Sequence, residues 1–549
     1  MPAWRGLIAW VALIPLLVAL LREPAAAHPR YLRNAGITGY LCGLLWYILN
    51  CYWIYQTMLL YGGGIPPIGA AGIVFLFSAV LGLYFGLFGF LLALFRRHFG
   101  LAPALALAPF AWVALDLAAA RITSVPWDQL GYSQVDNFRI AALAPWTGVY
   151  GITFFLVLAN VTWASLLLRP RGGKRDKTWN RITRFAFLGL CALLFLAHLT
   201  SPLSSPTSAT AVLLQDNLSV DQDNPWYGEI LDPQTGHMVP LWDYNIARYS
   251  AASQQTCTPF YVGMPEPGSL HIDDPHCAPS AISLIAWPEA PSPFRSWDPR
   301  FFFAMAGLAQ SAHSAVIAGN IAREPVVIHH RMELGDFNAA SVWGADGRFE
   351  GVYAKIHLVP FGEYVPYRGV FFFAHHLTQQ VGDFNRGVKR FVYPTGDTAS
   401  GDHRFGVFIC YESIFGDEVR HFAKDGAEVL VNISDDGWYG DTSAPWQHLN
   451  MARMRAIENR RWLLRDTNSG VTAAIDPWGR VTQSADRHVF TSLAVRYGYV
   501  SRRTFYTIFG DVFAYLCCLV VLFAIWKIYE PRWKEYQAKR KAASEPPLV

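Results

Sequence analysis

The chain has 549 residues, of which 52% are hydrophobic and only 16% charged, against about 25% charged in a typical soluble domain. This composition argues against a wholly soluble protein and indicates membrane-spanning segments. The net charge is only +4 and the basic residues flank apolar runs, so we expect no nucleic-acid partner. The eight cysteines form no paired CxxC motif and none lies beside an HxxxH, so we expect no metal site, and no cofactor.

Long apolar runs alternate with short loops over the first 200 residues. Each run is close to the ~20 residues that a bilayer core requires. We predict six spans, at about 7–21, 36–60, 66–95, 101–119, 138–168 and 184–200, and a seventh at about 509–526. The predicted domains are a transmembrane bundle (1–200), a domain outside the membrane (201–505), a C-terminal transmembrane helix (506–527) and a basic cytoplasmic tail (528–549).

The short loops alternate between basic and uncharged, which predicts the orientation. Lys and Arg favour the cytoplasmic side. They follow the first, third and fifth spans and recur in the tail, whereas "YGGGIPP" and 120–137 are nearly free of them. We therefore expect the 201–505 domain to face away from the cytoplasm. Residues 1–29 also resemble a cleavable signal peptide, and cleavage after Ala27 would leave the later spans against the charge rule, so we favour an uncleaved helix.

The domain outside the membrane reads as alternating strands and helices. Strands are predicted at 209–216, 281–289 and 314–321, with a hairpin over 338–355 that turns at Asp346-Gly347. "HRFGVFICYES" and "AEVLVNISDDGWYG" follow, then a helix from about 444 to 462 and two strands around a Pro-Trp-Gly turn. This order predicts a layered α/β sandwich.

Three polar groups each finish an apolar strand: Glu289, Lys355 and Cys410. A thiolate attacks where a thiol does not, and a carboxylate in a partly dry pocket can take the thiol proton. A lysine ammonium stabilises the thiolate and then an oxyanion, to which the N–H of Tyr411 would also donate. Each residue alone has a simpler interpretation: Cys410 as a buried apolar side chain, and the other two as solvated surface groups.

The order of these residues and their surroundings carry a resemblance. "AWPEA", "YAKIHLVPFGEYVP", "ICYESIFGD" and "PWQHLNMARMRAIENRRWLLRDTNSG" are similar to the carbon–nitrogen hydrolase (nitrilase) superfamily. With seven predicted spans around such a domain, the chain resembles the bacterial apolipoprotein N-acyltransferases. That resemblance implies a membrane α-helical bundle with an extracytoplasmic α/β sandwich of nitrilase type (α-β-β-α), in the bacterial inner membrane and facing the periplasm.

The resemblance also implies roles for residues of this chain. The family's catalytic glutamate, lysine and cysteine fall on Glu289, Lys355 and Cys410, and its supporting glutamates on Glu363 and Glu412, beside Lys355. Tyr411, Trp438 and Trp226 match aromatic positions near the family's site, and core packing is the alternative for each. The implied substrates are a membrane phospholipid as acyl donor and a diacylated apolipoprotein as acceptor. They would react through a Cys thioester in a ping-pong sequence, and a monomer is expected.

The chain departs from the family pattern in three places. The family usually has eight spans, and 1–21 is similar to its second. Asp435-Asp436 stands where the family commonly has Asn-Asp. Residues 251–280 look like an insertion, whose Cys257 and Cys277 either form a disulfide or stay free. The stretch 361–395, with the aromatic run at 369–376, would form an apolar lid.

Other functions stay open at this point. A membrane-bound amidase or nitrilase would release the acyl group to water through the same three residues. A transporter or receptor would carry buried ionisable residues within its spans, for which Asp116 is the clear candidate. A Cys–His protease would need His357 or His448 to orient Cys410.

Overall fold

The computed structural model describes residues 4–22, 26–168, 189, 204–218, 228–233, 235–256, 281–289, 294–328, 331–365, 384–396 and 401–544. Two compact units make up the chain. The helical unit comprises Met1–Asn50, Phe75–Ser201 and Asp511–Val549, and the sandwich unit comprises Cys51–Val74 and Pro202–Gly510. Several predictions fall outside the described residues: the span at 184–200 (Gly189 excepted), Trp226, Cys257, Cys277 and the stretch 369–376.

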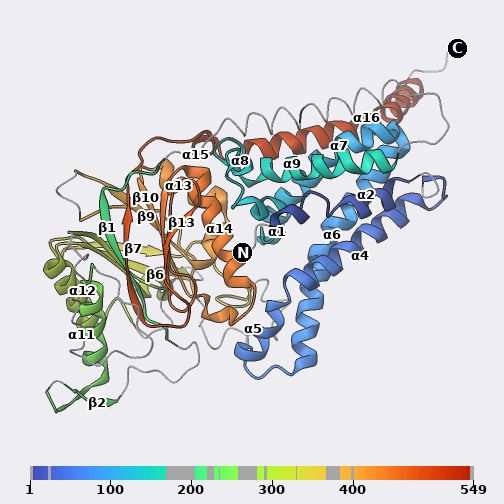
Figure 1. Cartoon of the computed structure of the whole chain (residues 1–549). Helices are drawn as coiled ribbons and strands as arrows, with labels where there is room; N and C mark the ends of the chain where they lie inside the picture. Colours follow the sequence, from blue (N-terminus) through green and yellow to red (C-terminus); the bar gives the residue numbers. More distant parts are fainter. Residues whose placement is uncertain are drawn as a thin grey trace. The chain divides into compact units, whose positions relative to one another are not determined.

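The helical unit contains long apolar helices (Figure 1). Its elements are α1 (Trp4–Ile8), α2 (Ile14–Leu21), α4 (Tyr31–Asn50), most of α6 (Pro67–Phe99), α7 (Leu101–Ala118), η1 (Ala119–Thr123), η2 (Leu130–Gln134), α8 (Phe138–Ala141), α9 (Ala144–Leu167) and α16 (Val512–Ser544). Within this unit α7 packs against both α9 and α16. Among the described residues, four helices are long and apolar enough to cross a membrane: Pro67–Phe99, Leu101–Thr123, Ala144–Leu167 and Val512–Pro531. Tyr31–Asn50 with Trp53–Tyr61 makes a fifth if the pair is one span.

Three predicted spans are interrupted in the structure. The run 7–21 forms two short helices, and Pro15, which lacks an N–H, lies in the first turn of the second. The run 36–60 breaks after Asn50, whose side-chain amide donates to the Trp46 carbonyl at 3.1 Å and so competes with helical bonding. The run 138–168 breaks between α8 and α9, and Gly148 (φ 65°) introduces a kink inside α9.

The last helix is longer than predicted. The sequence predicts a C-terminal transmembrane helix over 506–527, but α16 continues to Ser544, through most of the segment predicted as a basic tail. Charge pairs one turn apart stabilise the extension: Glu530 bonds Lys527 at 2.8 Å and Lys534 at 2.9 Å. The alternating charges therefore continue the helix after the apolar run has ended.

The sandwich unit is built on two six-stranded sheets. The first has the order β14-β1-β4-β5-β6-β7 and the second β13-β12-β11-β10-β9-β8. The first sheet comprises β1 (Ala209–Gln215), β4 (Ile282–Trp287), β5 (Ala315–Ile328), β6 (Arg331–Trp343), β7 (Phe349–Ala354) and β14 (Thr491–Tyr497). The second comprises β8 (Val392–Pro394), β9 (Arg404–Ile409), β10 (Val429–Ser434), β11 (Trp462–Thr467), β12 (Ala473–Ile475) and β13 (Val481–Ser484). A separate ribbon pairs β2 (Glu229–Leu231) with β3 (Met238–Pro240).

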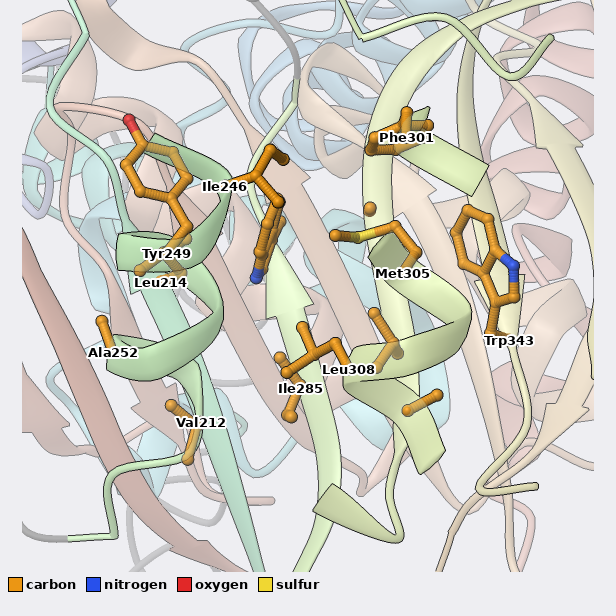
Figure 2. Close-up of a cluster of buried hydrophobic side chains, with 14 of the residues drawn as sticks. Val212, Leu214, Ile246, Tyr249, Ala252, Ile285, Phe301, Met305, Leu308 and Trp343 are labelled. Carbon is orange, nitrogen blue, oxygen red and sulfur yellow. The ribbon is translucent and has the colours of Figure 1, made fainter. Parts of the chain in front are cut away.

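Helices cover both outer faces of this sandwich. β11 contacts β1 and β4, which brings the two sheets face to face. On the first sheet, α11 (Leu241–Ser253) and α12 (Pro299–Ala312) bury the cluster drawn in Figure 2, where Ile246, Phe301 and Trp343 pack between helix and strand. On the second sheet lie α13 (Gly416–Lys424) and α14 (Ala444–Asn459). The observed α-β-β-α layering confirms the fold class expected from the sequence.

One further helix of the sandwich unit comes from far away in the sequence. α5 (Trp53–Tyr61) contacts the short turn η5 (Asp436–Tyr439), which follows β10. Thr57 Oγ1 donates to the Trp438 carbonyl at 3.0 Å, and Tyr61 Oη to the Gly437 carbonyl at 3.3 Å. The Trp53 ring meets Tyr439 edge to face at 5.1 Å. Residues 51–74 therefore belong with a sheet whose strands begin more than 300 residues later.

Candidate active site

A buried ammonium held by two carboxylates forms the centre of the site. Lys355 follows β7, and its Nζ lies 2.9 Å from Glu289 Oε1 and 2.9 Å from Glu363 Oε1. The lysine is only 1% exposed. Burial by itself lowers the pKa of Lys355, but the two carboxylates outweigh it and hold the pKa well above its usual value. The side chain therefore stays charged inside the protein.

Asn338 completes this cluster, although no motif marks it as a site residue. Its Nδ2 donates to Glu289 Oε1 and to Glu363 Oε1, both at 2.6 Å. It lies on β6 beside the end of β7, where its carbonyl accepts the Lys355 N–H at 2.8 Å. Counting residues back from the predicted Asp346-Gly347 turn places residue 338 opposite residue 355, which was the available signal. With Asn338 and Lys355 as donors, the two buried carboxylates can approach each other.

Cys410 directly follows β9 and has a strained backbone conformation. Its φ is +48°, a left-handed value that is uncommon for residues other than glycine, and it begins the short turn η4 (Cys410–Ile414). The residue is only 6% exposed. Burial first, and then the nearby Glu289 carboxylate, raise the pKa of the thiol well above its usual value, although Lys355 acts in the opposite direction. The resting sulfur is therefore a neutral thiol, so the lysine alone does not make the thiolate that the sequence suggested.

Glu412 has a different setting from the one expected. Instead of bonding the Lys355 ammonium, it accepts the backbone N–H groups of Ile356 and Ile409, both at 2.7 Å. The Tyr353 hydroxyl donates to both of its oxygens, at 2.8 and 2.9 Å. These bonds join the end of β7 to the end of β9. Glu412 thus fixes the strand that carries the lysine to the strand that carries the cysteine.

A polar network supports the backbone beneath the cysteine. His448 Nε2 lies 3.1 Å from the Cys410 carbonyl oxygen, and Nδ1 lies 2.9 Å from Asp436 Oδ1. Although burial disfavours its charge, Arg465 at 2.8 Å and His448 hold the pKa of Asp436 well below its usual value. His448 therefore contacts the main chain of Cys410, and His357 bonds Glu418 at 3.1 Å. Neither contact is the imidazole-to-sulfur pairing of a Cys–His protease.

Asp435 stands where the resembled family has an amide. Its N–H donates to Glu289 Oε2 at 2.9 Å, and its Oδ1 accepts from the Gly437 N–H at 2.9 Å and from Asn468 Nδ2 at 3.2 Å. Oδ2 is buried without a hydrogen-bond partner among the described residues. Burial, followed by the neighbouring carboxylates, raises the pKa of Asp435 well above its usual value. The main chain of this residue therefore orients Glu289, while its side chain is a neutral acid.

Two aromatic residues of the prediction lie on the turns that follow β9 and β10. Tyr411 is buried and its ring meets Phe415 edge to face at 5.3 Å. Trp438 is half-buried, and its ring meets Tyr61 of α5 edge to face at 5.1 Å. The contacts of α5 thus reach the segment directly after Asp435, a link that no local pattern in the sequence indicates.

Comparison with known families agrees with this arrangement. Residues 243–494 match the carbon-nitrogen hydrolase family, and residues 2–162 match the apolipoprotein N-acyltransferase N-terminal domain. The chain is similar to the apolipoprotein N-acyltransferases of Geobacter metallireducens (31% identity over 93% of this chain and 88% of that one) and Methylococcus capsulatus (32% over 90% and 88%).

Two solved structures each match just over half of this chain. An amidase from Nesterenkonia sp. matches at 16% identity with a TM-score of 0.32, over 54% of this chain and 93% of that one. A Saccharomyces cerevisiae member of the nitrilase superfamily matches at 16% identity with a TM-score of 0.35, over 55% and 93%.

Proposed function

The chain belongs to the apolipoprotein N-acyltransferase family, and on that premise we propose that it moves a fatty acyl chain from a membrane phospholipid to the N-terminal amine of a diacylglyceryl-cysteine apolipoprotein. The observation that carries the proposal is the buried Glu289–Lys355–Glu363 cluster, with 2.9 Å contacts, within electrostatic reach of a strained, buried Cys410. We assign Glu289, Lys355 and Cys410 as the catalytic residues.

In the first half-reaction Cys410 attacks the ester carbonyl of the phospholipid. Because the resting thiol is neutral, its proton must leave as the sulfur–carbon bond forms, and Glu289 accepts it. The Lys355 ammonium, with the Tyr411 N–H, stabilises the oxyanion of the tetrahedral intermediate. When the intermediate collapses, the carbon–oxygen bond breaks and Glu289 returns the proton to the departing lysophospholipid. An S-acyl cysteine remains.

In the second half-reaction the free amine of the apolipoprotein attacks the thioester. Glu289 takes one proton from the attacking nitrogen, and the carbon–sulfur bond then breaks to give an amide. The proton passes to the sulfur and restores the thiol, so the cycle consumes no net acid or base. Two half-reactions through one covalent intermediate predict ping-pong kinetics.

Supporting groups keep these residues in place during both steps. Glu363 and Asn338 hold the ammonium and the general base together, at 2.9 and 2.6 Å. Glu412 fixes the Cys410 strand relative to the Lys355 strand through two backbone N–H bonds at 2.7 Å. We further propose that a single chain acts at the bacterial inner membrane, with the sandwich unit on the periplasmic side, as the basic loops predict.

The experiment that tests the proposal separates the two half-reactions. Purified full-length protein is incubated with phospholipid, and intact mass spectrometry looks for one acyl adduct, with Cys410→Ala as the control. A diacylated lipopeptide is then added to the loaded protein. We expect the adduct to disappear as triacylated peptide forms. Loss of the adduct to water, with no acylated peptide, would favour a hydrolase instead.

A further inference from the structure

A small cavity inside the helical unit has no place in the reaction described above. It is lined by residues of α4, α6, α7, η1 and η2 and of the loop between η1 and η2: Trp46, Tyr47, Phe85, Trp112, Asp116, Ala119, Val125, Pro126, Trp127, Asp128, Gln129 and Leu130. It is partly open and has room for a group the size of a water molecule or an ammonium. Its walls combine aromatic rings with two acidic side chains.

Several buried polar atoms of the residues that line this cavity lack partners. Asp116 Oδ2, Asp128 Oδ2, both amide atoms of Gln129 and Trp112 Nε1 are buried with no hydrogen bond among the described residues. Gln129 is only 8% exposed. A buried amide or carboxylate oxygen without a partner is costly, and buried polar groups in folded proteins are nearly always satisfied. Three of these atoms are oxygens of residues that line one small space, and a ligand with several N–H donors would satisfy them.

The aromatic rings that line the cavity favour a positively charged donor. The Phe85 ring meets Trp112 edge to face at 5.0 Å and Tyr47 edge to face at 6.0 Å, and the Trp46 ring lies 6.2 Å from it. The faces of such rings attract cations, and aromatic cages are a recurrent means of binding ammonium groups. A primary ammonium carries three N–H donors, which matches the three free oxygens, and its charge offsets the two carboxylates.

The position of the cavity along the helices is consistent with the same ligand. Asp116 lies 15 residues after Leu101, which is roughly 22 Å along α7 at 1.5 Å per residue. α7 begins just after Arg96 and Arg97, so Asp116 is near the opposite end of the helix. Tyr47 likewise lies near the end of α4 that is remote from Arg33. The cavity is therefore at the uncharged end of the bundle, on the side where the proposed function places both substrates.

We propose that Asp116, Asp128 and Gln129 form a binding site for a primary ammonium group, enclosed by the surrounding aromatic rings. Two sources share this chemistry: the ethanolamine head group of a phospholipid and the free α-amine of a lipopeptide. The binding site itself rests on the cavity, and only its link to acyl transfer rests on the proposed function. A quaternary ammonium, which has no N–H, fits the oxygens poorly.

Native mass spectrometry of the full chain in detergent tests the site. The protein receives equal amounts of phosphatidylethanolamine and phosphatidylcholine with identical acyl chains, and in a parallel sample diacylated lipopeptide with a free or an acetylated N-terminus. We expect at least about fivefold preferential retention of the primary-amine form in one of the two comparisons. Preference for phosphatidylethanolamine identifies the head group as the source, and preference for the free peptide identifies the α-amine.

Variants then locate the preference. The pair Asp116→Asn and Asp128→Asn keeps the shapes of the side chains and removes the charges, so the retention ratio should fall to about one. Asp136→Asn removes a charge at an exposed position between η2 and α8, outside the cavity lining, and should leave the ratio unchanged. Equal retention of both forms by the wild type, or an undiminished preference in the double variant, would overturn the proposal.

Acyl-adduct formation on Cys410 from a short-chain ester without a head group is measured on the same samples. A protein that forms the adduct but shows no amine preference refutes this ammonium site and leaves the proposed function intact. A protein that shows the preference but forms no adduct refutes the proposed function and leaves the ammonium site intact.

Discussion

Replacing Lys355 by methionine tests the buried cluster most directly. Methionine nearly fills the space of the lysine stem, but it leaves Glu289 and Glu363 close together, with Asn338 as the donor that they share. Removing one member of a buried ion pair costs about 3–5 kcal/mol, because the remaining charge stays buried without compensation. For a unit of this size, at about 2.1 cal/mol/K per residue, that corresponds to a fall in Tm of roughly 4–7 °C.

Lys355→Met should also lower the rate of acyl transfer, for a reason independent of its effect on stability. Loss of one oxyanion donor lowers a rate by about 10²–10³. We therefore expect the Lys355→Met variant to form the acyl adduct at least about a hundredfold more slowly, measured by intact mass over time. Lys424→Met, at an exposed position on α13 of the same unit, is the matched control and should change neither quantity.

A double variant separates the two effects. Adding Glu363→Gln to Lys355→Met removes one of the stranded charges, so much of the lost Tm should return while the adduct still forms slowly. The reasoning would be refuted if Lys355→Met melted within about 1 °C of the wild type, which is less than 1 kcal/mol on the same scale. Restored acylation in the double variant would refute the assigned role of the ammonium.

Three further predictions concern the surroundings of the cluster. Folding raises the pKa of the Asp435 carboxyl, so this group favours the folded state fully below its unfolded pKa of about 3.9 and less as the pH rises. Asp435→Asn should therefore raise Tm at pH 8 and change it little near pH 4, as measured by thermal melts over a pH series. An equal rise in Tm at both pH values would contradict the neutral state assigned to Asp435. In Glu412→Gln the side-chain NH2 group would face backbone N–H donors, which should lower the free energy of unfolding by about 1–3 kcal/mol and slow adduct formation. Glu350→Gln, at the exposed end of β7, should change neither quantity. Replacing Thr57 by valine and Tyr61 by phenylalanine removes two hydrogen bonds of about 1 kcal/mol each and should speed amide hydrogen exchange in 436–440; unchanged exchange would show that α5 does not stabilise that turn.

The sequence predicted the positions that strand ends determine. Glu289, Lys355 and Cys410 each follow an apolar run, and the structure places all three in one buried region, because β4, β7 and β9 present the same end of the sandwich. The hairpin over 338–355 turns where Asp346-Gly347 predicted it, with Trp343 paired to Phe349.

Other features depend on contacts that no local pattern reveals. The neutral state of the Cys410 thiol follows from its burial beside a carboxylate, and the sequence shows which residues precede and follow it but not how deeply it is buried. The partners of Glu412 are backbone N–H groups, which every residue carries. The position of α5 is also not predictable, because the apolar composition of this nine-residue helix is that of a membrane span whether it packs against the helical unit or the sandwich unit.

The membership of Cys51–Val74 in the sandwich unit has a consequence for biosynthesis. A ribosome releases this segment about 130 residues before the first strand of the sandwich, and the turn on which α5 packs emerges only near residue 436. Residues 51–74 therefore have no packing partner from the sandwich unit during most of translation. A shortened gene product that starts at residue 202 would never receive it, so attempts to express the sandwich alone should supply residues 51–74 as a separate peptide.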